Sequence, residues 1–161
     1  MSDPLPPAHA DAVSTLATAL TDLTEPWALT GSTSFALQGI PVEPTDIDLQ
    51  TTEAGARAVE ARWNEAVTDP VSYVESDQVR SYFGAISLCG VAVEVMGALQ
   101  KRDADGRWTE PPAIGELRQR VTVAGTSVPV LPLAYEANAY EQLGRTSRAA
   151  LLRTHAHQRS E

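Results

Sequence analysis

The sequence predicts an α/β fold of the α+β type, in which helices flank a β-sheet. Two short strand-like segments, 27–30 and 45–50, enclose a helix-like stretch. The middle of the chain alternates apolar and polar residues, which is typical of strands, and amphipathic helix patterns lie near both ends. A bundle of helices does not fit the strand-rich middle.

The N-terminal half alternates helices and strands. Pro26 is expected to end the first helix, and Thr52 is a suitable N-cap for the third. The predicted elements are a loose tail at 1–7, a helix over 8–24, a strand at 27–30, a helix over 32–38, a strand at 45–50 and a helix from Thr52 to Glu65.

The second half is predicted to contain two hairpins and two helices. Cys89-Gly90 and Ala124-Gly125-Thr126 are the expected hairpin turns, and Gly144 is the expected C-cap of the first helix. The elements are strands at 72–75, 82–88, 91–96, 117–123 and 127–131, then helices over 133–143 and 147–155. We therefore expect a domain over 8–131, with residues 132–161 as a helical extension packed on it.

Two motifs lie at the ends of the first two predicted strands. Gly31-Ser32 follows one strand, where backbone N–H groups can approach an anion at a helix start. Asp46 and Asp48 lie two residues apart in the other strand, so they are expected to share one face. Side-by-side carboxylates repel each other unless a cation lies between them, and Mg²⁺ suits carboxylates and phosphates. The sequence therefore predicts phosphate and metal binding at one site.

A third carboxylate is expected to join this pair. Glu94 lies in the alternating segment 91–96, where valines occupy the opposite face. A lone buried carboxylate is costly unless it is paired or binds a metal. If the two strands are neighbours, three carboxylates converge; otherwise Glu94 lies on the solvent side of a half-exposed strand.

This combination of motifs resembles the nucleotidyltransferase superfamily related to DNA polymerase β, and its small bacterial minimal and antibiotic-type members above all. The resemblance covers residues 27–50, extends to Met96, and beyond that depends on element order. It implies a mixed sheet flanked by helices, two Mg²⁺ ions, and transfer of a nucleotide from a nucleoside triphosphate such as ATP to an acceptor.

The resemblance also implies a role for each site residue. Asp46, Asp48 and Glu94 would hold the ions, with Glu94 as a possible general base. Gly31 and Ser32 would hold the β- and γ-phosphates.

Two further features concern the triphosphate. Arg145 and Arg148, between the last two predicted helices, correspond to basic residues that help to hold it in relatives; the alternative is a solvated helix start. Relatives often carry a basic residue just before the Asp-x-Asp motif, whereas this chain has Glu43 there. An acid at that place weakens triphosphate binding, so the sequence leaves open whether the protein is catalytically active.

Composition limits the partners and the location. The net charge of −9 argues against nucleic-acid binding, and no apolar run is long enough to predict a membrane span. The single cysteine, Cys89, and the absence of a signal-peptide pattern favour the cytoplasm.

The predicted function is thus a magnesium-dependent nucleotidyltransferase that acts on an acceptor hydroxyl. The alternative is a weakly active or inactive module of the same fold that serves as an antitoxin-like or regulatory binding partner. The acceptor stays open among an antibiotic or other small molecule, a tRNA end and a protein hydroxyl.

Overall fold

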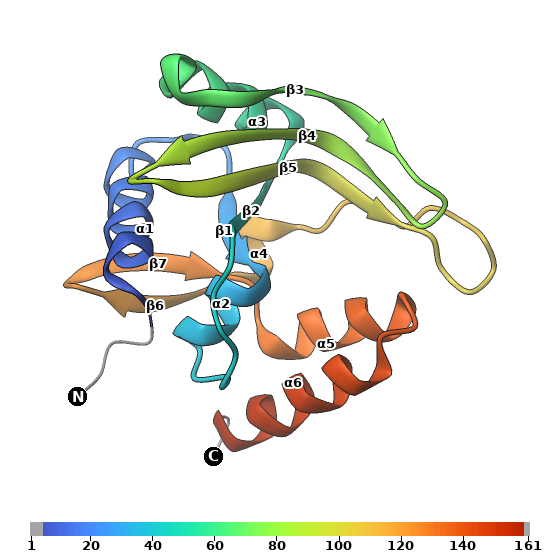
Figure 1. Ribbon diagram of the computed structural model, residues 1–161. Helices are drawn as coiled ribbons and strands as arrows, with labels where there is room; N and C mark the ends of the chain where they lie inside the picture. Colours follow the sequence, from blue (N-terminus) through green and yellow to red (C-terminus); the bar gives the residue numbers. More distant parts are fainter. Residues whose placement is uncertain (1–4, 160–161) are drawn as a thin grey trace.

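A mixed seven-stranded sheet forms the centre of the computed structural model, which describes residues 5–159 (Figure 1). The strands are β1 (Trp27–Thr30), β2 (Ile47–Thr51), β3 (Val67–Glu75), β4 (Val79–Leu88), β5 (Val91–Lys101), β6 (Gln119–Val123) and β7 (Thr126–Val130). Their order in the sheet is β3-β4-β5-β2-β1-β7-β6. Strand β2 runs parallel to β5 and antiparallel to β1, so the predicted mixed α+β fold is confirmed.

Helices cover both faces of this sheet. They are α1 (Pro7–Ala19), α2 (Gly31–Leu37), α3 (Glu53–Arg62), the 3-10 turn η1 (Asn64–Ala66), α4 (Ile114–Leu117), α5 (Leu133–Gln142) and α6 (Thr146–Arg159). α5 and α6 form a pair beneath the long β4–β5 ribbon (Figure 1). Among the described helices, none is both long and apolar enough to cross a membrane.

Alternation along β2 and β5 separates the core from the other face of the sheet. Ile47 and Leu49 are fully buried, as are Val93 and Val95 on the neighbouring strand, and they pack in one cluster with α1 and α3. The residues between them, including Asp48 and Glu94, point away from this cluster. The predicted face assignment is therefore confirmed for both strands.

The first helix differs from its prediction at both ends. It begins at Pro7, a residue favoured in the first turn, and Leu5 before it is buried, so the described part of the predicted tail is packed. It ends at Ala19 instead of residue 24. The i, i+3 spacing of Leu20 and Leu23 belongs to a turn, in which the Leu23 N–H donates to the Leu20 carbonyl.

Three strands are longer than predicted, and the short helix α4 was not predicted. β3 starts at Val67, β4 at Val79, and β5 continues to Lys101. The added parts lack clean apolar alternation, so the sequence pattern did not predict them. Polar contacts hold them together instead.

The predicted Thr52 cap is confirmed, since its hydroxyl accepts the Gly55 N–H at 2.9 Å.

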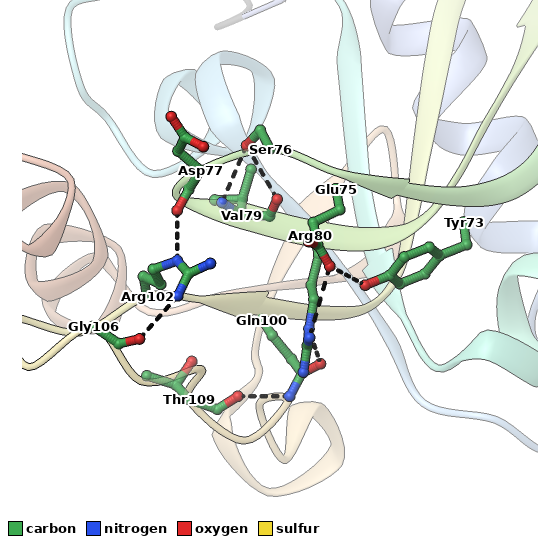
Figure 2. Close-up of polar contacts among 10 residues, drawn as sticks. All are labelled: Tyr73, Glu75, Ser76, Asp77, Val79, Arg80, Gln100, Arg102, Gly106 and Thr109. Atoms are coloured by element: carbon green, nitrogen blue, oxygen red, sulfur yellow. Dashed lines mark hydrogen bonds and ion pairs between the residues drawn. The ribbon is translucent and has the colours of Figure 1, made fainter.

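The far end of the β4–β5 ribbon is held by a polar network (Figure 2). The Arg80 guanidinium donates to the Gln100 side chain at 2.8 Å, and Gln100 donates to the Thr109 carbonyl at 2.9 Å. Arg80 and Arg102 both lie over the Trp108 ring, 4.4 and 4.5 Å from its centre. These contacts hold in place the part of the ribbon that faces α5.

The C-terminal helices share a core with α2. Phe35 contacts Tyr140, with ring centres 5.9 Å apart. The buried members of this cluster are Phe35, Ile40, Leu133, Ala137, Ala149 and Leu152. Gly144 ends α5 with a φ of +80°. The helices α5 and α6 thus pack against α2, which directly follows β1, and the domain boundary at 131 stays a prediction.

Candidate active site

Asp48 lies at the centre of the candidate site. It occupies the second position of β2, where it pairs with Thr30 of β1 on one side and with Glu94 of β5 on the other. The structure therefore brings together the two strands whose proximity the sequence left open. Glu94 is half-buried beside Asp48 rather than isolated on a solvent face.

Asp46 lies just before β2 and not within it, which corrects the expected strand start at residue 45. Its side chain still joins the group, because it shares a hydrogen bond with the Glu94 carboxyl and interacts electrostatically with Asp48. The backbone carbonyl of Asp46 accepts the Thr33 hydroxyl of α2 at 3.1 Å. A helix contact therefore places Asp46, where the sequence suggested strand alternation.

Ser32 holds the residue next to Asp46. Its hydroxyl accepts the Thr45 N–H at 3.0 Å and lies 3.1 Å from the Thr45 hydroxyl. Thr33 and Ser32 together fasten the segment that carries the first carboxylate. A phosphate contact by Ser32 stays a prediction, and its hydroxyl already has this structural role.

Gly31 separates two acidic side chains. Its φ of +74° lies in the left-handed region, and a Cβ at this position would lie 2.3 Å from Asp48 Oδ2. On the other side, its backbone N–H donates to the Glu136 carboxyl. Only glycine allows this backbone conformation and this close approach to Asp48.

Two of the clustered carboxyls, Asp48 and Glu94, have a raised affinity for protons. Burial raises the pKa of Asp48 to about 7, with further contributions from the charges of Glu94 and Asp46. The hydrogen bond with Asp46, then burial and the Asp46 charge, raise the pKa of Glu94. Over the described residues, no three acidic, histidine or cysteine side chains already form an ion cage. The arrangement is a cluster of acids, and none of the arginine or lysine side chains that the structure describes forms an ion pair with it.

Glu136 is a further acid at the site that the sequence analysis did not identify. It projects from α5, is only 4% exposed, and accepts the Thr30 hydroxyl. Burial raises its pKa to about 7, against the opposing effects of Thr30, Lys101 and the Gly31 N–H. The available signal was its spacing, since Glu136 lies three residues after Leu133 on the buried face of a predicted helix.

A cavity of about 200 Å³ opens between the sheet and α5, beside Asp48. It is lined by residues of β1, α2, β2, β4, β5, α5 and the α5–α6 junction: Thr30, Gly31, Asp48, Gln50, Val79, Met96, Leu99, Lys101, Glu136, Ala139, Tyr140, Leu143 and Arg145. The end of the β4–β5 ribbon that the polar network holds therefore forms one wall, and α5 forms the opposite wall.

The two predicted phosphate-binding arginines differ in position. Arg145 lines the cavity, and its guanidinium lies 5.5 Å from the centre of the Tyr140 ring. Arg148 is exposed on α6 and does not line the cavity, although its charge acts on Tyr140. Of the two arginines, Arg145 is the one that lines the cavity together with Asp48 and Glu136.

The sequence model of the aminoglycoside-2''-adenylyltransferase family matches residues 12–156. The chain belongs to this family, and its fold and family are those of a nucleotidyltransferase. No curated protein matches the sequence.

Solved structures agree with this assignment. TM1012 from Thermotoga maritima, described as a candidate nucleotidyltransferase, is 38% identical, with a TM-score of 0.83 and coverage of 93% of each chain. The antibiotic-resistance factor ANT(2'')-Ia is 12% identical with a TM-score of 0.58, over 90% of this chain and 82% of that one. The lincosamide adenylyltransferase LnuA is 7% identical with a TM-score of 0.59, over 92% and 97%. The last two show the shared fold alone.

Proposed function

We propose that this protein is a magnesium-dependent nucleotidyltransferase that moves a nucleoside monophosphate from a nucleoside triphosphate to an acceptor hydroxyl. The observation that supports it most directly is the meeting of Asp46, Asp48 and Glu94 on two paired strands and the segment before one of them. Membership of an adenylyltransferase family agrees with this chemistry.

The donor set suits Mg²⁺. Asp46, Asp48 and Glu94 offer carboxylate oxygens only, and burial, together with the charges of Glu94 and Asp46, raises the pKa of Asp48. These three residues would hold two ions. Bound magnesium would supply charge neutralisation at the phosphates and a lowered barrier for in-line displacement.

The remaining roles belong to the chain itself. Glu94, with a raised pKa and half exposure, is proposed as the general base that takes the proton of the acceptor hydroxyl. Free N–H groups in the first turn of α2, at Gly31-Ser32, would contact the β- and γ-phosphates. The Gly31 N–H is shared with Glu136, so Ser32 offers the less encumbered donor. Arg145, and more weakly Arg148, would add positive charge.

The acceptor is proposed to be a hydroxyl-bearing small molecule in the cytoplasm. ANT(2'')-Ia has been solved with adenylyl-2''-tobramycin and LnuA with lincomycin, so relatives of this fold bind antibiotics. The net charge of −9 and the acidic site disfavour a tRNA end. An amino-bearing acceptor would be attracted to the acidic cluster.

A second candidate is a weakly active module that binds nucleotide for regulation or acts as an antitoxin-like partner. The observation in its favour is Glu43, an exposed acid where relatives often have a basic residue. The presence of three neighbouring carboxyls speaks against it. The charges of Asp46 and Glu94 raise the free-energy cost of ionising Asp48, and an inactive site has no need of such a group.

Incubation with ATP, Mg²⁺ and tobramycin, followed by assay of pyrophosphate and of the acceptor's mass, tests the proposal. We expect the Asp48→Asn variant to lose magnesium-dependent ATP binding, and the Glu94→Gln variant to lose about 10²–10⁴-fold in turnover with a smaller loss in binding. Without metal, Asp48→Asn should melt no lower than wild type at pH 8, because an acid with a raised pKa destabilises the fold once ionised.

The matched control is Asp105→Asn, an exposed acid in the turn at 103–106. It should leave binding and turnover unchanged. Equal ATP affinity in wild type and Asp48→Asn would contradict the metal assignment. Tight magnesium-dependent ATP binding with no pyrophosphate release, for any of a panel of aminoglycosides and lincosamides, would favour the binding module.

A further inference from the structure

A second cavity, of about 290 Å³, lies between the C-terminal end of α1, the loop that leads to β1 and the β6–β7 hairpin. Figure 1 shows α1 beside this hairpin. Trp27, at the start of β1, lines the second cavity, whereas Thr30, at the end of that strand, lines the cavity beside Asp48. None of the described residues lines both cavities, and the two ends of β1 are about 10 Å apart. The second cavity is therefore separate from the candidate active site.

Two arginines line the second cavity from one extended segment. Arg118 has an extended backbone just before β6, and Arg120 is the second residue of that strand. Residues two apart in an extended segment project to the same side, and here both line the second cavity. Arg118 donates to the Trp27 carbonyl at 3.1 Å, and Arg120 donates to the Ser127 hydroxyl at 3.4 Å. Each guanidinium has five N–H donors, so most of them remain available to a ligand.

Neither of these arginines forms an ion pair with a carboxylate that the structure describes. Asp22, in the loop that lines the second cavity, pairs with Arg62 at 3.0 Å instead. Burial, and then the charge of Arg120, lowers the pKa of the Arg118 guanidinium, which still carries its charge at neutral pH. Two neighbouring positive charges thus repel each other without a countercharge, in a chain whose net charge is −9. An anion in the second cavity would relieve this repulsion.

Hydroxyl groups and apolar side chains form the rest of the lining. The Ser127 hydroxyl accepts from Arg120, so its own proton can be donated to an anion. Thr18 adds a further hydroxyl, and Leu23 and Pro129 add apolar surface. The volume of about 290 Å³ is close to the lower limit of the roughly 300–1,000 Å³ that small-molecule sites occupy. The second cavity therefore has room for an oxyanion together with a small organic group.

We propose that the second cavity binds a small phosphorylated molecule, and that Arg118 and Arg120 hold its phosphate group. This inference goes beyond the proposed nucleotidyltransferase function and does not depend on it. Guanidinium groups bind phosphate through paired N–H donors, and two of them match the charge of a phosphate monoester, which is about −1.5 to −2. A carboxylate carries a single negative charge and would leave one arginine uncompensated. The apolar part of the lining contacts the carbon skeleton of the ligand.

Titration calorimetry with ribose 5-phosphate and with ribose tests the assignment, in EDTA and at about 0.15 M salt, where ions screen distant charges. Without divalent metal, the acidic cluster at Asp48 repels a phosphate. Wild type should bind ribose 5-phosphate at least about tenfold more tightly than ribose. Arg120→Gln should weaken this binding about two- to fivefold, as for an exposed ionic contact. Arg118→Gln should weaken it about 10- to 150-fold, because Arg118 is half-buried and its hydrogen bonds to the anion are charged.

Two further measurements separate ligand binding from folding and from net charge. Arg118 also contacts the Trp27 backbone, so the melting temperature of Arg118→Gln is measured beside its affinity. Arg120→Gln, at an exposed position, should melt like wild type and decides the question if the other variant unfolds. The matched control is Arg107→Gln, which removes the same charge at an exposed position outside both cavities and should bind ribose 5-phosphate like wild type.

Equal affinity of wild type for ribose 5-phosphate and ribose would overturn the inference. An equal loss in Arg107→Gln and Arg120→Gln would do the same, because it would reflect net charge alone. So would a loss in Arg145→Ala with none in Arg120→Gln, which would move the phosphate to the candidate active site. None of these results bears on the proposed function, which is tested with ATP and Mg²⁺.

Discussion

Gly31 allows Asp48 to occupy the centre of the site. Its backbone adopts a left-handed φ of +74°, and the space where a Cβ would lie belongs to Asp48 Oδ2. A side chain here would therefore strain the backbone and displace a proposed metal ligand at the same time. The glycine of the Gly-Ser motif is required by the carboxylate beside it, whatever its part in phosphate binding.

Gly31→Ala is expected to cost more stability than the same change at Gly106, whose φ of +79° is similar but whose Cβ would meet nothing within 4 Å. Both variants lose about 1–2 kcal/mol to left-handed backbone strain. Gly31→Ala should lose about 1–3 kcal/mol more, because Asp48 must move. Chemical denaturation measures the difference. Equal losses in the two variants would mean that Asp48 has room to relax.

Residue types at the site were easier to predict than their surroundings. Asp46, Asp48 and Glu94 stood out because strand alternation exposes acids among valines and isoleucines. Glu136 and Gln50 did not, because an acid in a helix or an amide in a strand is ordinary until its burial is known. Burial depends on packing between segments that are distant in the chain, as for Glu136 and Thr30, which lie 106 residues apart, and no local pattern contains this packing.

At the scale of elements, the junction of α5 and α6 decides which basic residue reaches the site. Gly144 ends α5 with a positive φ, and Arg145 follows it beside Tyr140 at the cavity. Arg148 lies in the first turn of α6, at an exposed position. The sequence proposed both arginines because the resemblance implies basic residues near this helix junction, and the observed start of α6 at Thr146 is one residue before the predicted one. Which arginine lines the cavity depends on how the junction packs, and that packing is not visible in the sequence.

Arg145→Ala should therefore weaken magnesium-dependent ATP binding by about two- to fivefold, close to the value of an exposed ionic contact. Arg148→Ala should change it by less than about twofold. The loss at Arg145 should shrink in high salt, because ions screen an exposed guanidinium. Binding titrations at low and high ionic strength measure both variants. An equal loss in both, or in neither, would contradict the assignment of the triphosphate to the cavity side of the junction.

The ribbon β3–β5 shows the limit of sequence patterns for elements. The hairpin at Cys89-Gly90 was predicted because two alternating segments flank a glycine turn. The outer part of the same ribbon was missed, since Arg80, Gln100 and Trp108 hold it through side-chain contacts between distant segments. This outer part carries the cavity wall at Val79 and Lys101, so an unpredicted extension contributes to the candidate site.

For the whole molecule, the central question is whether residues 132–161 are a separate extension. Two contacts argue for integration. Glu136 accepts the Thr30 hydroxyl at the end of β1, and Tyr140 of α5 contacts Phe35 of α2, with ring centres 5.9 Å apart. The buried cluster that contains Phe35 joins α2 to α5 and α6. We therefore expect the chain to unfold as one unit.

Leu152→Ala tests this expectation at a distance from the site. Leu152 is fully buried in the cluster that joins α6 to α2, so its truncation should cost about 2–5 kcal/mol. If the C-terminal helices are integral, circular dichroism and the fluorescence of the three tryptophans, all of which precede residue 131, should report one shared transition, shifted to lower denaturant. Val74→Ala, at a side chain 43% exposed on β3, should shift it by less than about 0.5 kcal/mol. Two separate transitions in Leu152→Ala, with the second unchanged from wild type, would show instead that residues 132–161 unfold independently of the domain that carries Asp48.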